Sequence, residues 1–155
     1  MATPFQYADL AYVKAQGLMP KSDVDALETK EGAGFVDGVC EVVSRIFDSK
    51  LVKRYAVPQP SPFPDSLRRR VTDVVVRRLY GRRGWPPGGG GPDDEVVKAA
   101  DAAEAWLTDA VESEHGLSEL VRTNGVSAVE KGGPLGYSEA SPYDWMDRQS
   151  EAVRG

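Results

Sequence analysis

Apolar residues between positions 34 and 56 recur at intervals of three and four, the spacing of one face of a helix. They are Val36, Val39, Cys40, Val43, Ile46, Phe47 and Leu51. The pattern predicts a helix over residues 34–56 with this face in a core. The stretch 58–64 follows with a proline at every second position. Prolines have fixed φ angles and no N–H group, so this stretch favours an extended connector.

A second helix is predicted over residues 64–81, with Pro64 in its first turn. Its apolar side consists of Leu67, Val71, Val74, Val75 and Leu79. Its polar side consists of Arg69, Arg70, Asp73 and Arg77. Arg78 is the exception, because its angular position places it on the apolar side. Its guanidinium should therefore either reach solvent or meet an acidic group.

The stretch 84–92 is rich in glycine and proline and predicts a surface loop. A third helix should follow over residues 94–115, with Asp93 or Asp94 as its N-cap and Gly116 as its end. Its buried side would be Val96, Ala100, Ala103, Leu107, Ala110 and Val111. Its outer side would carry Asp101, Glu104, Asp109 and Glu112, with Trp106 at the border.

The two ends of the chain have weaker patterns. Thr3 followed by Pro4 predicts a short capped helix that ends near Gln16, and residues 22–27 predict a further helical turn. From residue 117 onward, glycines and prolines interrupt any apolar period. We therefore expect an all-α fold, a small bundle of three to four main helices over residues 1–118, with an extended C-terminal tail over 119–155.

The composition is that of one globular domain, because 155 residues and 41% hydrophobic residues suffice for a single core. No apolar run approaches the roughly 20 residues of a membrane-spanning helix. The N-terminus has no pattern of a secretory signal, so we expect the protein to stay where it is made and to bind no membrane.

The charge is unevenly distributed along the chain. Residues 50–83 hold 10 basic and 2 acidic groups, and residues 84–116 hold 1 basic and 8 acidic groups.

Residues suited to catalysis are few. Cys40 is the only cysteine and lies on an apolar helix face, and His115 is the only histidine and precedes the expected helix end. No triad or His-rich metal site can be assembled from them. The glycine run 88–91 lacks the Lys-Ser/Thr of a phosphate-binding loop. We expect neither enzymatic activity nor a cofactor.

The strongest chemical signal is a block of arginines, Arg68, Arg69, Arg70, Arg77, Arg78, Arg82 and Arg83. It has three interpretations: a solvated helix face, a site for DNA phosphates, or a docking surface for the acidic helix of another subunit.

The C-terminal tail has two interpretations. It is either a disordered end or a recognition segment anchored by a late cluster of large side chains, Tyr137, Tyr143, Trp145 and Met146.

Three stretches together resemble one known family. The first is Asp48 to Pro58, with Leu51 and Arg54-Tyr55 between them. The second runs from Leu67-Arg68-Arg69 through Asp73 to Arg78-Leu79-Tyr80-Gly81-Arg82-Arg83, and the third is Ala105-Trp106-Leu107 before Gly116-Leu117. In order and spacing they are similar to the head-to-tail connector proteins of tailed bacteriophages, the adaptor or head-completion family of Mu-like phages.

The resemblance implies an all-α structural protein of the virion neck, assembled in the bacterial cytoplasm. Members of that family form a homo-oligomeric ring, commonly twelve-fold, beneath the portal protein. The ring extends the channel for packaged DNA, which it contacts transiently, and offers a surface to the next neck or tail-completion protein. A C-terminal segment typically docks into the portal. The rival hypothesis is a DNA-binding helical regulator that uses the arginine-rich second helix.

Overall fold

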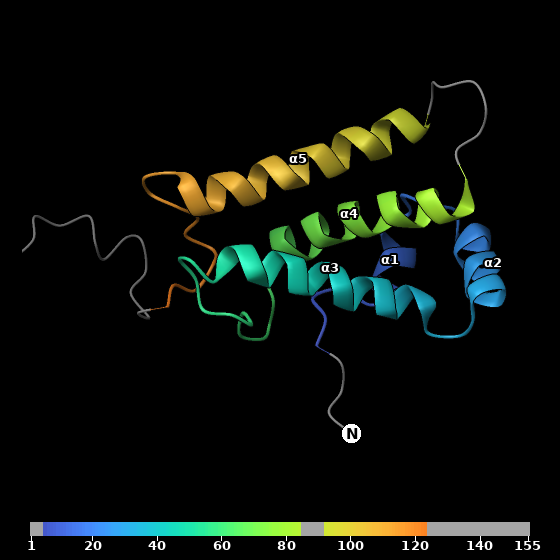
Figure 1. Cartoon of the computed structure of the whole chain (residues 1–155), viewed down its shortest axis with the longest axis horizontal. Coiled ribbons are helices and arrows are strands. Elements are labelled where there is room, and N and C mark those ends of the chain that lie inside the picture. The colour runs from blue at the N-terminus through green and yellow to red at the C-terminus, as the bar shows by residue number, and fades with distance from the viewer. Residues whose placement is uncertain (1–4, 85–91, 124–155) are drawn as a thin grey trace, which may run out of the picture.

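A computed structural model describes residues 5–84 and 92–123 of the chain (Figure 1). These residues form the helices α1 (Leu10–Gln16), α2 (Lys21–Glu31), α3 (Phe35–Leu51), α4 (Asp65–Arg83) and α5 (Pro92–Glu112). Within the described ranges the only β-pairing is an isolated bridge between Tyr55 and Arg122. The predicted all-α bundle is therefore confirmed. Thr3, the stretch 85–91 and the residues from 124 onward, including the tail cluster, lie outside the described residues.

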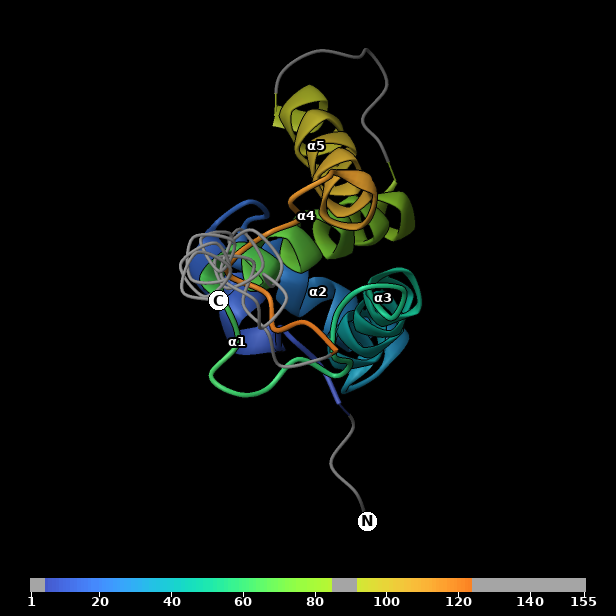
Figure 2. The same ribbon diagram turned by 90° about the vertical axis from the view of Figure 1, so that its left-hand side faces the viewer.

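Helix α4 is the centre of the bundle. It packs against α2, α3 and α5, and Figures 1 and 2 show it between α3 and α5, antiparallel to both. All six residues from 71 to 76 are buried as a result. The prediction of a single apolar side was therefore too narrow. Asp73, which we placed on the polar side, is only 4% exposed, and Arg78, which we placed on the apolar side, is exposed.

The helix ends differ from the predicted ends where local hydrogen bonds decide them. Helix α1 begins at Leu10 because the Asp9 side chain accepts a hydrogen bond from the Tyr12 N–H and acts as the N-cap. The turn expected at 22–27 is part of the longer α2. Helix α3 ends at Leu51 rather than at 56. Helix α5 begins at Pro92 rather than at 94, so Asp93 and Asp94 lie inside the helix and neither is its N-cap. It ends at Glu112 rather than at 115, and Gly116 has a φ of +62° in the turn that follows.

The segment before α1 packs into the domain through aromatic side chains. Tyr7 is only 1% exposed, and its ring makes edge contacts with Phe5 and Phe63 at centroid distances of 4.9 and 5.1 Å. Its backbone N–H donates to Ser44 Oγ in α3 at 3.0 Å. The N-terminal segment and the proline-rich connector are therefore both held against the middle of the bundle.

The connector after α3 and the chain after α5 hold each other at one end of the bundle. The Tyr55 hydroxyl donates to the Ala110 carbonyl at 2.8 Å and accepts the Leu117 N–H at 2.7 Å. The Arg54 guanidinium donates to the carbonyls of Ser113 and Glu114, where a cation complements the negative end of α5. The chain then returns, and Leu120 is buried in the core. Residues 119–123, which we assigned to the tail, thus pack on the domain.

Candidate docking surfaces

Arg68 is used inside the subunit. Its Nε donates to the Tyr7 carbonyl at 3.2 Å, and its guanidinium carbon lies 3.9 Å from the centre of the Tyr12 ring. This cation–π contact and the hydrogen bond join α4 to α1 and to the segment before it. Arg68 therefore holds the fold together, and only part of its side chain faces solvent.

Several other arginines pair with acidic groups of the same chain. Arg77 Nη1 lies 2.9 Å from Asp101 Oδ1 across the contact between α4 and α5. Arg83 Nη1 lies 3.2 Å from Asp23 Oδ2 in α2. The basic and acidic helices, which the sequence suggested could face each other across a subunit boundary, thus already meet within one subunit.

The buried carboxyl of Asp73 has one close basic partner. Arg70 Nη1 lies 3.6 Å from Asp73 Oδ2. Burial raises the pKa of Asp73 above its ordinary value, while the positive charges of Arg70 and Arg69 act in the opposite direction. Arg70 is therefore partly committed to this carboxyl, whereas Arg69 is exposed.

Within the arginine block, Arg69, Arg78 and Arg82 form no ion pair with any residue in the described ranges, and they lack the contacts that hold Arg68. On the acidic side, the same holds for the exposed carboxylates of Asp109 and Glu112. Glu104 borders a hollow between α4 and α5 together with Asp101, Arg77 and Arg78. Fewer charged side chains are therefore available to bind a partner than the sequence suggested, and they are distributed over more than one surface.

One surface depression combines exposed arginine with large aromatic side chains. We call it the Trp106 hollow, a depression of about 690 Å³ lined by Tyr12, Gln16, Asp65, Ser66, Arg69, Arg70 and Trp106. Trp106 is half-buried, as its predicted border position implied. The hollow joins α1, α4 and α5. Trp, Tyr and Arg are the residue types that most often dominate the binding energy of protein interfaces.

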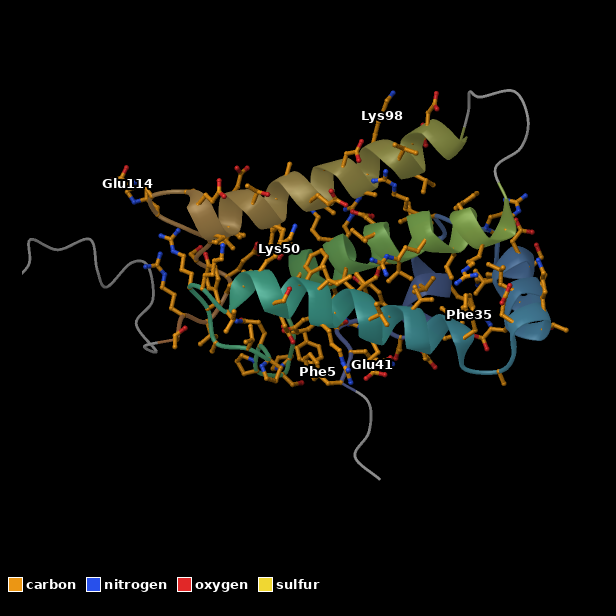
Figure 3. All side chains as sticks on the ribbon, in the orientation of Figure 1. Phe5, Phe35, Glu41, Lys50, Lys98 and Glu114 are labelled. Atoms are coloured by element: carbon orange, nitrogen blue, oxygen red, sulfur yellow. The ribbon has the colours of Figure 1, made fainter. Side chains whose placement is uncertain are left out.

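A second depression runs between α3 and α4. This α3–α4 groove has a volume of about 710 Å³ and is lined by Phe35, Gly38, Val39, Val42, Arg78, Gly81 and Arg82. Val42 is 49% exposed, and the nearby Ile46 is 36% exposed. Figure 3 shows Phe35 at the end of α3 that adjoins α2. One wall is therefore apolar and comes from α3, and the other carries two arginines of α4.

The periodicity of residues 34–56 predicted that Ile46 lies in the core, and Phe35 and Val42 were not part of the predicted apolar face. A signal was present, because Phe35, Val39, Val42 and Ile46 follow one another at spacings of four, three and four. They form a second apolar stripe beside the buried stripe of α3. A helix with two such stripes has more apolar surface than one neighbouring helix covers.

The two residues considered for catalysis have different environments. Cys40 is fully buried, and burial, assisted by the charge of Asp37, raises the pKa of its thiol to about 12. His115 is exposed beyond the end of α5. In the described part of the chain no group of His, Cys, Asp and Glu side chains is arranged to hold a metal ion. None of the described helices is both long and apolar enough to span a bilayer.

Comparisons with protein-family models, curated proteins and solved structures found no match to this chain.

Proposed function

We propose that the protein is a structural adaptor of a tailed phage or phage-like particle, which forms a ring beneath the portal and joins the capsid to the tail. The proposal rests on the resemblance of residues 48–58, 67–83 and 105–117 to head-to-tail connector proteins. The confirmed all-α fold agrees with it. In this role the protein extends the DNA channel and performs no chemical reaction.

The structural feature that supports a contact between neighbouring subunits is the Trp106 hollow. It brings the rings of Tyr12 and Trp106 together with Arg69, which forms no ion pair with any described residue. The outer face of α5 carries the exposed carboxylates of Asp109 and Glu112, which have no ion-pair partner among the described residues. A contact between the Trp106 hollow of one subunit and the Asp109 and Glu112 carboxylates of the next would pair opposite charges, and repetition of such a contact closes a ring when the rotation permits.

Charge alone cannot hold such a ring together. Exposed ion pairs contribute about 0 to 1 kcal/mol each, so they set register and association rate more than affinity. Burial of the Trp106 and Tyr12 rings would supply the larger share. Arg70, Arg77 and Arg83 have acidic partners in the same chain, so less of their charge is available for docking. Arg69 should therefore supply more of the electrostatic attraction between subunits.

The neighbours in this role are the portal protein above and the next neck or tail-completion protein below. The portal contact is assigned to the C-terminal segment, with Tyr137, Tyr143, Trp145 and Met146 as anchors. Packaged DNA would pass through the ring with transient, nonspecific contacts. The protein would be assembled in the bacterial cytoplasm and retained at the portal vertex of the virion.

Pull-down of the purified portal protein tests the proposal directly. Trp145→Ala should weaken portal binding by about 2 kcal/mol, the loss typical of an interface anchor. Trp85→Ala is the matched control, because Trp85 belongs to the Gly/Pro-rich stretch rather than to the C-terminal cluster. If the unmodified chain, Trp145→Ala and Trp85→Ala all recover the same amount of portal protein, the proposed portal contact is wrong.

Electron microscopy of particles made without the protein tests the role as a whole. We expect capsids that lose DNA and carry no tails.

The rival hypothesis of a DNA-binding regulator requires that the purified protein bind free duplex DNA with a steep salt dependence. Only Arg69, Arg78 and Arg82 of the block lack a strong contact within the described chain. If particles made without the protein are normal and the purified protein binds duplex in this way, the regulator hypothesis is favoured over the adaptor hypothesis.

A further inference from the structure

The α3–α4 groove has the features of a site for an extended segment that is both apolar and acidic. Its α3 wall presents Phe35, Val39 and the half-exposed Val42. Its α4 wall presents Arg78 and Arg82, which have no acidic partner among the described residues. An occupant should therefore bring apolar side chains for one wall and carboxylates for the other.

The groove also has room for a chain to approach closely. Gly38 in α3 and Gly81 in α4 both line it. A Cβ atom placed on either glycine would have no heavy atom of the described residues within 4 Å. Since neither position carries a side chain, bulky aromatic rings of an occupant can enter between the two helices.

One stretch of the same chain has the required chemistry. Residues 135–147 read Leu-Gly-Tyr-Ser-Glu-Ala-Ser-Pro-Tyr-Asp-Trp-Met-Asp. They include the large side chains Leu135, Tyr137, Tyr143, Trp145 and Met146. They carry the carboxylates of Glu139, Asp144 and Asp147 and contain no lysine or arginine. This is the complement of an apolar wall beside two arginines that form no ion pair with a described residue.

We propose that the α3–α4 groove binds residues 135–147 of its own chain in the free protein. The aromatic side chains lie against the Phe35, Val39 and Val42 wall, and the carboxylates face Arg78 and Arg82. The proposal concerns the free chain and does not rest on the adaptor function. If the adaptor function is correct, residues 135–147 must leave this groove before they can bind the portal protein.

The length of the chain permits this contact within one subunit. The Thr123 N–H bonds to the Arg54 carbonyl, just beyond the end of α3. Phe35 and Leu51 are the ends of a helix of 17 residues, a rise of about 24 Å. The 11 residues from 124 to 134 allow a span of up to about 40 Å between Thr123 and Leu135. A short covalent connection also gives an effective concentration of about 1 mM, above that of separate chains in dilute solution.

Hydrogen exchange of the intact chain, followed by mass spectrometry, tests the proposal. If the groove is occupied about nine-tenths of the time, amides of residues 135–147 should exchange about tenfold more slowly than in a free peptide of the same sequence. Val42→Asp places a charge in the apolar wall and should abolish this protection. Val52→Asp is the control, because Val52 is similarly exposed at 55% but lies beyond α3 and does not line the groove.

A second pair of variants tests the arginine wall. Arg82→Glu should reduce the protection, and Lys53→Glu, an equal charge reversal at an exposed site outside the groove, should leave it unchanged. Peptide-like exchange of residues 135–147 in the unmodified chain would overturn the proposal. Protection that disappears on dilution from about 100 to 1 µM would also overturn it, because the groove would then be filled by the segment of another copy.

Discussion

The Tyr7 hydroxyl donates a hydrogen bond to the Asp48 carboxylate and so joins the segment before α1 to the last turn of α3. The same hydroxyl oxygen accepts the backbone N–H of Gln59 at 3.0 Å. Because Tyr7 is almost fully buried, water cannot replace these bonds. One side chain thus connects three parts of the chain that are far apart in the sequence.

Removal of this hydroxyl should destabilise the fold. Tyr7→Phe keeps the ring contacts but leaves the Asp48 carboxylate and the Gln59 N–H without their partner, a loss of about 1–3 kcal/mol in the free energy of unfolding. Urea denaturation measures it. Tyr12→Phe is the control, because the Tyr12 ring, not its hydroxyl, contacts Arg68. Equal stability of the two variants would show that the Tyr7 hydrogen bonds contribute nothing.

The Asp48 carboxyl should also give the stability a distinctive pH dependence. Burial raises the pKa of Asp48 above its ordinary value, although the hydrogen bond from Tyr7 opposes the shift. The folded chain therefore holds this proton more tightly than the unfolded chain does. The contribution of Asp48 to stability falls as the pH rises from the ordinary carboxyl pKa, about 4, through the raised value, and it stays low above that.

Asp48→Asn removes this titration while it keeps an oxygen that can accept the bond from Tyr7. The stability of the variant minus that of the unmodified chain should therefore increase between about pH 3.5 and pH 7. Denaturation midpoints measured across this range give the difference. Two parallel curves would show that Asp48 titrates alike in the folded and unfolded chain.

Gly116 should tolerate no side chain. Its φ of +62° is unfavourable for other residues, and a Cβ there would lie 2.5 Å from Tyr55 Oη and 3.0 Å from the Arg54 guanidinium. Gly116→Ala should cost about 1–3 kcal/mol because it combines backbone strain with a displaced hydrogen-bond network. Gly81→Ala, inside α4 and with no described heavy atom within 4 Å of the added Cβ, should instead gain about 0.5–1 kcal/mol. Thermal unfolding distinguishes the two, and a stable Gly116→Ala chain would contradict the close approach of Tyr55.

The sequence predicted the parts of the fold that depend on one helix at a time. Val36, Cys40 and Leu51 are buried as the periodicity of α3 indicated. The prediction failed for Asp73 because a helical projection assumes one buried side, whereas α4 is covered by three helices. No pattern within one helix could show this, because burial of Asp73 depends on how the other helices are placed around it.

The docking charges were harder to predict for a similar reason. The opposite charges of Arg77 and Asp101 were visible in the sequence, but their pairing within one chain depends on the antiparallel register of α4 and α5. The Trp106 hollow likewise brings together Tyr12, Arg69 and Trp106 from three helices. Sequence spacing assigns residues to the face of one helix. It does not say which faces of different helices share a depression.

Arg69 is the residue whose charge should decide whether subunits associate. It is exposed at the Trp106 hollow and forms no ion pair with a described residue, whereas Arg70 lies 3.6 Å from Asp73 Oδ2. The charge of Arg69 also acts on the Asp73 carboxyl, but without such a contact. Arg69→Glu should therefore oppose the acidic face of a neighbouring α5 and raise the concentration needed for ring formation about tenfold or more. Size-exclusion chromatography and electron microscopy of rings assembled on the portal measure this.

The contact can be separated from a folding defect and from a general effect of charge. Lys53→Glu makes the same charge change away from the hollow and should assemble normally. Circular dichroism should show unchanged helicity in both variants. Asp109→Lys combined with Glu112→Lys should restore assembly of Arg69→Glu subunits, because the opposed charges are then exchanged rather than removed. If Arg69→Glu subunits assemble like the unmodified chain, the Trp106 hollow is not the contact between neighbours.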